Sequence, residues 1–369
     1  MIKKKFFHFL RNFIFSLGAL GSLLYLLTCT TPYLSPSYCY LSTFFALSFP
    51  IGLIIMICWC LISLFFYRKY FWIFFVCLLF GYKNIFSVFA FNLGNKFEKA
   101  KSPNSIRILS WNVNNFLTSA PEDTITIKKM LNFIQNSGAD IICFQDYSSI
   151  EFHKTQATTE NLKKITSLPY SYFTEADKNY GVIIFSRWPI IKQVSIPYNN
   201  ISSSESLQYV DIKTPIKVIR VYNTHLCSMN IHVEVMNNSN INHLKFITYD
   251  TAILMHKSKL NRLAYFDKLH EKQAYLIKKS LDSADIPFIY AADMNSVPSS
   301  FVYHHISAGL NDAFLQKGFG FGRTYDSLSP TLRIDVLLTS PSLETKQYYS
   351  PRLHLSDHLP IITDIQIKL

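Results

Sequence analysis

The strongest constraint in this sequence is the absence of Asp and Glu before Glu98, in an interval filled with long apolar stretches. A water-soluble domain of that length would need acidic side chains on its surface. Three apolar spans are expected: about Phe13–Thr28, Leu41–Phe66 and Phe71–Phe91. Each is near the roughly 20 residues that a helix needs to cross the hydrocarbon core. The sequence therefore predicts a membrane module at 1–97 and a water-soluble domain at 98–369.

Basic residues beside the spans set the expected orientation, because positively charged loops stay in the cytoplasm. The cluster at 3–5 and the pair at 68–69 are expected there, which puts residue 97 onward outside the cytoplasm of a bacterial inner membrane. Lys83 inside the third span would either snorkel or mark the outer end of that span. If one span is a re-entrant segment, the orientation inverts. A signal peptide is the alternative for the N-terminus, but further spans follow and favour an anchor.

The net charge of +12 belongs mostly to the membrane module. Residues 1–97 hold eight Lys and Arg and no acid, whereas residues 98–369 hold 28 basic and 24 acidic residues. Most of the basicity is therefore a topology signal, and it neither supports nor excludes a nucleic-acid substrate. The seven Cys form no Cys-x-x-Cys pair, so a cysteine-based zinc site is not expected.

Strand and helix patterns alternate from Ile106 onward. Apolar residues at 127, 130, 131 and 134 have helical spacing, and Gly138 should end that helix. Lys257–Leu281 is the longest helical pattern. Apolar runs typical of strands occur at Ile106–Trp111, Asp140–Gln145, Gly181–Ser186, Lys217–Thr224, Ile286–Ala292, Arg333–Thr339 and Pro360–Gln366. Several of these runs lead into a polar residue, and such residues are expected to converge along one edge of a sheet.

Short polar segments carry the chemistry of this domain. They are Ser110-Trp111-Asn112, Phe144-Gln145-Asp146, Asn223-Thr224-His225-Leu226, Ala292-Asp293-Met294-Asn295, Arg333-Ile334-Asp335 and Ser356-Asp357-His358. Amide and carboxylate oxygens are hard ligands that suit Mg²⁺ or Mn²⁺. A His beside a carboxylate is suited to proton transfer near neutral pH. Each segment alone is more often an ordinary turn or surface pair, so the prediction depends on their joint presence.

In their order and spacing these segments resemble the endonuclease/exonuclease/phosphatase superfamily, which includes pancreatic-type deoxyribonuclease, apurinic endonucleases and neutral sphingomyelinases. The resemblance covers about Arg107–Leu369 and includes Ser-Asp-His-x-Pro at 356–360. It implies a four-layer α/β sandwich with two mainly antiparallel sheets, preceded here by transmembrane helices. It also implies hydrolysis of a phosphate ester by in-line attack of water, with Mg²⁺ or Mn²⁺ as cofactor.

The resemblance implies a role for each residue that handles the phosphate and the proton. His225 matches the histidine that contacts the phosphate or assists the leaving group. Asp293 matches the residue that orients the attacking water, and Asn295 the one that steadies the phosphate. His358 matches the general base or phosphate-stabilising histidine, and Asp335 the carboxylate that pairs with it.

The resemblance also implies a metal side formed by Asn112, Asp146 and Asp357, with Asn112 near the scissile phosphate as well. Asp146 stands where the family normally has Glu as its principal metal ligand. Because Asp is one methylene shorter, its carboxylate reaches an ion less readily, and Mg²⁺ tolerates ligation through water. We therefore expect a retuned metal affinity, with a weakened enzyme as the alternative.

The substrate stays open at this level. A nuclease acting outside the cytoplasm is the favoured prediction, because nuclease activity is widespread in the superfamily. A phospholipid or sphingomyelin phosphodiesterase, or a phosphatase, is the alternative, since the anchor holds the domain at a bilayer. A catalytically weak binding module on the same fold is the alternative of another class. No obligate protein partner is evident, and Ser228–His256 is either a substrate-shaping loop or a simple insertion.

Overall fold

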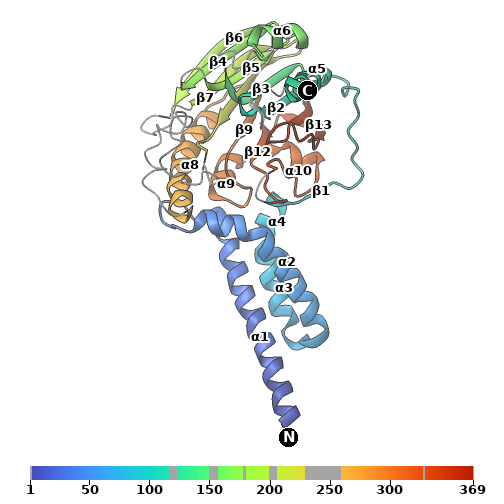
Figure 1. Cartoon of the computed structure of the whole chain (residues 1–369), viewed down its shortest axis with the longest axis vertical. Helices are drawn as coiled ribbons and strands as arrows, with labels where there is room; N and C mark the ends of the chain where they lie inside the picture. Colours follow the sequence, from blue (N-terminus) through green and yellow to red (C-terminus); the bar gives the residue numbers. More distant parts are fainter. Residues whose placement is uncertain are drawn as a thin grey trace.

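The computed structural model describes residues 2–116, 124–148, 157–177, 180–198, 206–228, 259–326 and 329–368. An α/β sandwich stands on a bundle of helices, and the N-terminus lies at the far end of that bundle (Figure 1). The insertion predicted at Ser228–His256 lies, apart from Ser228, outside the described residues.

The helical bundle is formed by α1 (Ile2–Cys29), α2 (Ser42–Phe66), α3 (Phe71–Phe80) and α4 (Tyr82–Val88). Helices α1 and α2 are each long and apolar enough to cross a membrane. The predicted third span is a broken pair, because α3 and α4 are bent by 54° on either side of Gly81. A Cβ on Gly81 would meet the hydroxyl of Tyr25 on α1, so only glycine allows this close approach.

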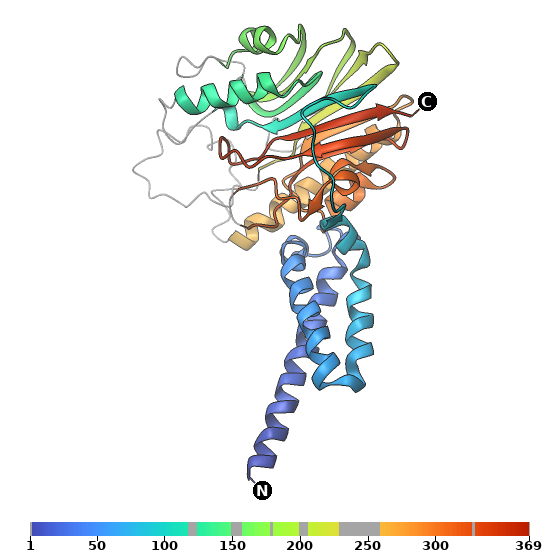
Figure 2. The same ribbon diagram turned by 90° about the vertical axis from the view of Figure 1, so that its right-hand side faces the viewer.

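Short 3₁₀ turns join the long helices: Thr31–Tyr33 and Arg68–Tyr70. The turn between α2 and α3 and the N-terminus of α1 both lie at the end of the bundle away from the sandwich (Figures 1 and 2). The turn between α1 and α2 lies at the opposite end, under the sandwich. The two basic clusters of the membrane module therefore share one end of it.

Two six-stranded sheets form the sandwich, with strand orders β13-β14-β2-β3-β5-β4 and β10-β12-β9-β8-β7-β6. The first consists of β2 (Ser105–Asn112), β3 (Ile141–Ser148), β4 (Tyr170–Asp177), β5 (Tyr180–Ser186), β13 (Leu343–Tyr349) and β14 (Ile361–Ile367). The second consists of β6 (Ile190–Pro197), β7 (Ser206–Lys213), β8 (Val218–His225), β9 (Phe288–Asp293), β10 (Asn311–Asp312) and β12 (Asp335–Thr339). Only β2–β3 and β8–β9 are parallel pairs among these described strands, which confirms the prediction of mainly antiparallel sheets.

Helices cover the outer face of each sheet, which gives the four predicted layers. Helices α5 (Thr124–Asn136) and α6 (Thr159–Thr166) pack on the first sheet, and α8 (Lys259–Asp282) and α9 (Phe301–Ser307) pack on the second. Adjacent residues of β2 face different layers: Ile108 lies between the sheets and Leu109 packs toward α5. Both are fully buried, and each such side chain contributes about 1.5–3 kcal/mol.

Smaller elements connect the sandwich to the bundle. A two-stranded sheet pairs β1 (Ala90–Phe91), which follows α4, with β11 (Phe319–Gly320). Helix α10 (Ala313–Lys317) precedes β11, and the turn Asn114–Phe116 follows β2. Residues just beyond the helical bundle are thus held by main-chain hydrogen bonds to the sandwich.

Candidate active site

Three neighbouring strands of the second sheet bring three predicted residues directly side by side. His225 at the end of β8 pairs with Asp293 at the end of β9, and Asp293 pairs in turn with Asp335 at the start of β12. Strands β8 and β9 are parallel, so their C-terminal ends lie side by side. Strand β12 is antiparallel to β9, so its first residue lies at the same edge of the sheet. From the first sheet, Asn112 at the end of β2 and the segment before β14 reach the same place.

Asp293 is the centre of this arrangement and its side chain is buried. Its Oδ2 lies 2.9 Å from Nδ2 of Asn112, 3.4 Å from Nε2 of His225 and 3.6 Å from Nε2 of His358. These three groups come from β2, β8 and the segment before β14. One carboxylate oxygen is therefore held between two imidazoles and an amide, a geometry suited to positioning a water molecule for attack.

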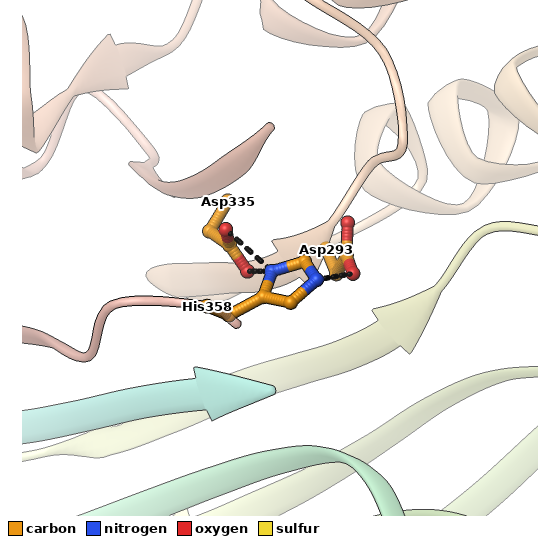
Figure 3. A group of neighbouring side chains, drawn as sticks. All are labelled: Asp293, Asp335 and His358. Carbon is orange, nitrogen blue, oxygen red and sulfur yellow. Dashed lines mark hydrogen bonds and ion pairs between the residues drawn. The ribbon is translucent and has the colours of Figure 1, made fainter. Parts of the chain in front are cut away.

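His358 and Asp335 form a buried pair, shown with Asp293 in Figure 3. Nδ1 of His358 lies 2.9 and 3.1 Å from the two carboxylate oxygens of Asp335, so Nε2 is the nitrogen that faces Asp293. Burial lowers the pKa of His358, but Asp335 and Asp293 outweigh burial and raise it to about 10. Burial raises the pKa of Asp335 to about 6, against the opposing charge of His358. Imidazolium and carboxylate together are the form that this geometry stabilises near neutral pH.

Asn295 is fixed by the loop after β9. Its φ of 44° is in the left-handed region, which Asn tolerates better than most residues. Its main-chain N–H donates to Oδ1 of Asp293 at 3.0 Å, and its Nδ2 donates to the carbonyl of Leu226 at 2.9 Å. The same Nδ2 lies 3.1 Å from Nε2 of His225. Asn295 and His225 thus present one polar surface beside Asp293.

The comparisons with known proteins agree with this geometry. A family model described as the endonuclease/exonuclease/phosphatase family matches residues 109–358. This chain belongs to that family. A second model, for a domain of unknown function (DUF8431), matches residues 9–88. Among curated proteins no significant match is found.

Solved structures share the fold at low sequence identity. The human nocturnin catalytic domain with bound sulfate is 14% identical, with a TM-score of 0.52 over 74% of this chain and 97% of that one. A family member from Beutenbergia cavernae is 18% identical, with a TM-score of 0.50 over 72% of both chains. One from Bacteroides thetaiotaomicron is 15% identical, with a TM-score of 0.50 over 72% of this chain and 96% of that one. These likenesses support the sandwich fold.

Asp146, where the family normally has Glu, occupies a local irregularity of β3. The pairing of β3 with β5 shifts between Phe144 and Tyr147, and both of these residues pack in the same outer core. The bulge leaves Asp146 outside the normal alternation of faces, with φ of 49°. Nδ2 of Asn115 donates to its Oδ1 at 3.2 Å. Burial raises the pKa of Asp146, and the charge of His225 is the largest effect that opposes burial.

The donor set on this side fits a divalent cation. Asn112, Asp146 and Asp357 offer only oxygen ligands, which are the ligands that Mg²⁺ and Mn²⁺ prefer. Burial disfavours the charge of Asp146, and Asp357 adds further negative charge beside it. A bound cation would neutralise both carboxylates. The negative charge of Asp357 near the half-buried carboxylate of Asp146 is therefore the observation that supports an ion at this position.

Asp293, Asp335 and His358 also satisfy a distance criterion for metal binding, since one ligand atom from each lies within 4.8 Å of the others. Nδ1 of His358 is bonded to Asp335 and Nε2 lies 3.6 Å from Oδ2 of Asp293, so both ring nitrogens face carboxylates. A His held by a carboxylate and facing a second carboxylate fits proton handling at least as well as metal ligation. The two carboxylates and the histidine are therefore assigned to the proton and phosphate side.

Several supporting residues were not predicted from the sequence. Nε2 of Gln145 donates to Oδ1 of Asn223 at 2.8 Å, and this bond joins the two sheets directly beneath the site. Oγ1 of Thr324 accepts from the main-chain N–H of Asp335 at 3.0 Å. The ring of Tyr325 lies 4.8 Å from that of His358. Gln145 and Asn223 belong to two of the polar segments found in the sequence, so their presence at the site could have been predicted. The contacts of Thr324 and Tyr325 depend on the conformation of a loop, and no sequence pattern predicts that conformation.

Proposed function

We propose that this protein is a membrane-anchored phosphodiester hydrolase that depends on Mg²⁺ or Mn²⁺. Family membership supports phosphoesterase chemistry in general. The observation that carries the proposal for this chain is the position of Asp293 Oδ2 between Asn112, His225 and His358. Groups that orient water, bind phosphate and move a proton then surround one point between the two sheets.

The proposed roles follow from the contacts. Asp293 holds the attacking water, and charged His358, fixed by Asp335, stabilises negative charge on the phosphate. Asn295 and His225 bind the phosphate oxygens from the side of β8. A divalent ion held by Asn112, Asp146 and Asp357 would supply polarisation of a phosphoryl oxygen.

We also propose that residues 1–97 anchor the domain of residues 98–369 and that this domain lies outside the cytoplasm. Support comes from two apolar helices of sufficient length and from the bent pair α3–α4 as a third span. Support for the orientation comes from the common position of the N-terminus and the Arg68–Tyr70 turn, at the end away from the sandwich. Positively charged ends are retained in the cytoplasm.

For the substrate we propose a nucleic acid first, with a phospholipid headgroup as the second candidate. One observation favours the second: Ala46 and Leu47 in the second turn of α2 share an apolar cluster with Ile334, the neighbour of Asp335. The site is therefore near the membrane boundary, where phosphodiesters of lipids are abundant. A nucleic-acid substrate predicts steep salt dependence of binding, and a lipid substrate predicts dependence on its surface concentration.

The test is turnover by the purified full chain in nanodiscs, with bis-p-nitrophenyl phosphate, plasmid DNA, RNA and phospholipid or sphingomyelin vesicles as substrates. Each is assayed with Mg²⁺ or Mn²⁺ and with EDTA. His358→Ala is the inactive variant, and His354→Ala is its matched control, because His354 lies in the same segment with a side chain that is 72% exposed. Metal-dependent turnover that His358→Ala removes and His354→Ala keeps would support the proposal. Silence of the folded parent on every substrate would favour the binding module.

A further inference from the structure

The helices of the membrane module touch three segments that carry catalytic residues. These segments are the loop 296–300 after Asn295, the stretch Leu332–Ile334 before Asp335, and Tyr325 beside His358. Figure 2 shows the upper ends of the helices directly beneath this part of the sandwich. The contacts are specific and buried, so they do more than tether the domain.

The loop after Asn295 is held by hydrogen bonds from the membrane module. Oγ1 of Thr31 lies 2.6 Å from the carbonyl of Ser299 and 2.8 Å from that of Thr28, and Oγ of Ser87 lies 3.0 Å from the carbonyls of both Pro298 and Asn84. Each hydroxyl therefore shares its one proton between the loop after Asn295 and its own helical segment. In the opposite direction, Oγ of Ser299 donates a hydrogen bond to the carbonyl of Ala46 in α2 at 2.7 Å. All of these side chains are buried. The main chain three and four residues beyond Asn295 is thus fixed by α4 and by the turn after α1.

The helices also contact the residues that immediately precede strand β12, which begins with Asp335. Arg333 is buried, and its NH2 donates to the carbonyl of Ser87 at 2.9 Å, while its NH1 pairs with Asp312 at 2.6 Å. Next to it, Ile334 packs in the apolar cluster that includes Ala46 of α2. A displacement of α4 or α2 would therefore move the chain immediately before Asp335.

The third contact reaches His358. Leu47 of α2 packs in the same cluster as Tyr325, and the Tyr325 ring lies 4.8 Å from the ring of His358. Tyr325 also forms an isolated β-bridge with His358. Asn295, Asp335 and His358 are therefore each one or a few residues from a contact with the membrane helices.

We propose that the membrane module is a positioning element of the catalytic site, and that Thr31 and Ser87 are positioning residues that set turnover through the loop after Asn295. This inference rests on the proposed hydrolase function. Neither residue contacts the reacting groups; each acts by fixing the main chain on which Asn295 is mounted. Small displacements of such groups are costly, because catalysis requires reacting atoms in a narrow geometry.

The experiment compares steady-state kinetics of the full chain in nanodiscs with the soluble substrate bis-p-nitrophenyl phosphate. The test variant is Thr31→Val with Ser87→Ala, which removes both hydroxyls and keeps the side-chain volumes similar. The matched control is Ser22→Ala with Ser63→Ala, two buried hydroxyls that bond only within the helical bundle. The conservative variant is Thr31→Ser with Ser87→Thr, which keeps both donors. Hydrogen exchange at residues 294–300 is measured on each.

The expected result is a fall in kcat of about tenfold to a hundredfold in the test variant, with faster exchange at 294–300. KM should rise as well, because Asn295 is itself a proposed phosphate-binding group. The control should match the parent, and the conservative variant should recover most of the activity. An active parent whose kcat the test variant leaves unchanged would overturn this inference alone. A parent inactive on every substrate would overturn the hydrolase function, and this inference with it.

Discussion

Acidification should destabilise the sandwich through His270, a residue of α8 that the sequence motifs do not include. Its side chain is fully buried between the loops after β8 and β9. Nε2 lies 2.6 Å from the carbonyl of Cys227, and Nδ1 lies 3.2 Å from Oγ of Ser296. Burial lowers the pKa of His270 to about 4, although Cys227 and Asp293 act in the opposite direction. The imidazole is therefore neutral in the folded protein.

The size of the effect follows from the two pKa values. In the unfolded chain a histidine has its ordinary pKa of 6.5, so between pH 6.5 and pH 4 the unfolded state binds more protons than the folded state. Stability is then fully present above pH 6.5 and is lost as the pH falls toward 4. The complete loss corresponds to about 3 kcal/mol, of which about 2 kcal/mol falls between pH 7 and pH 5.

Urea unfolding of the full chain in non-ionic detergent measures this loss, with fluorescence of buried Trp111 as the probe of the sandwich. His270→Gln should be about 1 kcal/mol less stable than the parent at pH 7, because it keeps only part of the hydrogen bonding. Between pH 7 and pH 5, however, it should lose about 2 kcal/mol less than the parent. Exposed His354→Gln should follow the parent. Equal losses in the parent and in His270→Gln would refute the reasoning.

Three further outcomes are expected. His358→Ala should lower kcat by a factor of about 10²–10⁴ in the nanodisc assay, and a loss below about tenfold would remove it from the mechanism. Asp146→Glu should lower the Mg²⁺ concentration for half-maximal activity, because the longer side chain reaches the ion directly; an unchanged Mg²⁺ titration would argue against Asp146 as a ligand. Leu337→Ala should cost about 2–5 kcal/mol in urea unfolding, since Leu337 is buried between the sheets. A decrease in the free energy of unfolding of less than about 1 kcal/mol would mean that neighbouring side chains fill the cavity left by Leu337.

The central strands were predictable because both of their faces are covered. In β2 and β9 every residue is buried, and β9 appears in the sequence as a mainly apolar run, whereas β2 also buries polar residues such as Arg107. Strand β6 was not predicted, since it lies at the edge of its sheet and most of its side chains are exposed or half-buried. Its register depends on β7, and a single strand carries no local signal for such pairing.

Motif order predicted which residues would form a site, but it did not predict the geometry in which the structure places them. His225, Asp293 and Asp335 are cross-strand neighbours, a relation that follows only from the order β8-β9-β12 in the sheet. The bulge at Asp146 arises from pairing with β5, about 35–40 residues later in the chain. Propensity alone gives no reason for a left-handed Asp inside a buried strand.

The domain boundary at residue 97 was predicted from composition. Composition does not reveal that the sandwich of residues 98–369 is contacted by side chains of residues 1–97. Thr31 and Ser87 look neutral among apolar residues, because a hydroxyl that bonds a distant carbonyl leaves no pattern in the sequence. A fragment that begins near Lys99 would expose Ile334 and would remove the Ser87 carbonyl that buried Arg333 contacts. Leaving a buried guanidinium donor without its partner is costly. The proposed hydrolase activity should therefore be measured on the whole chain, since the fragment lacks part of the support for the candidate site.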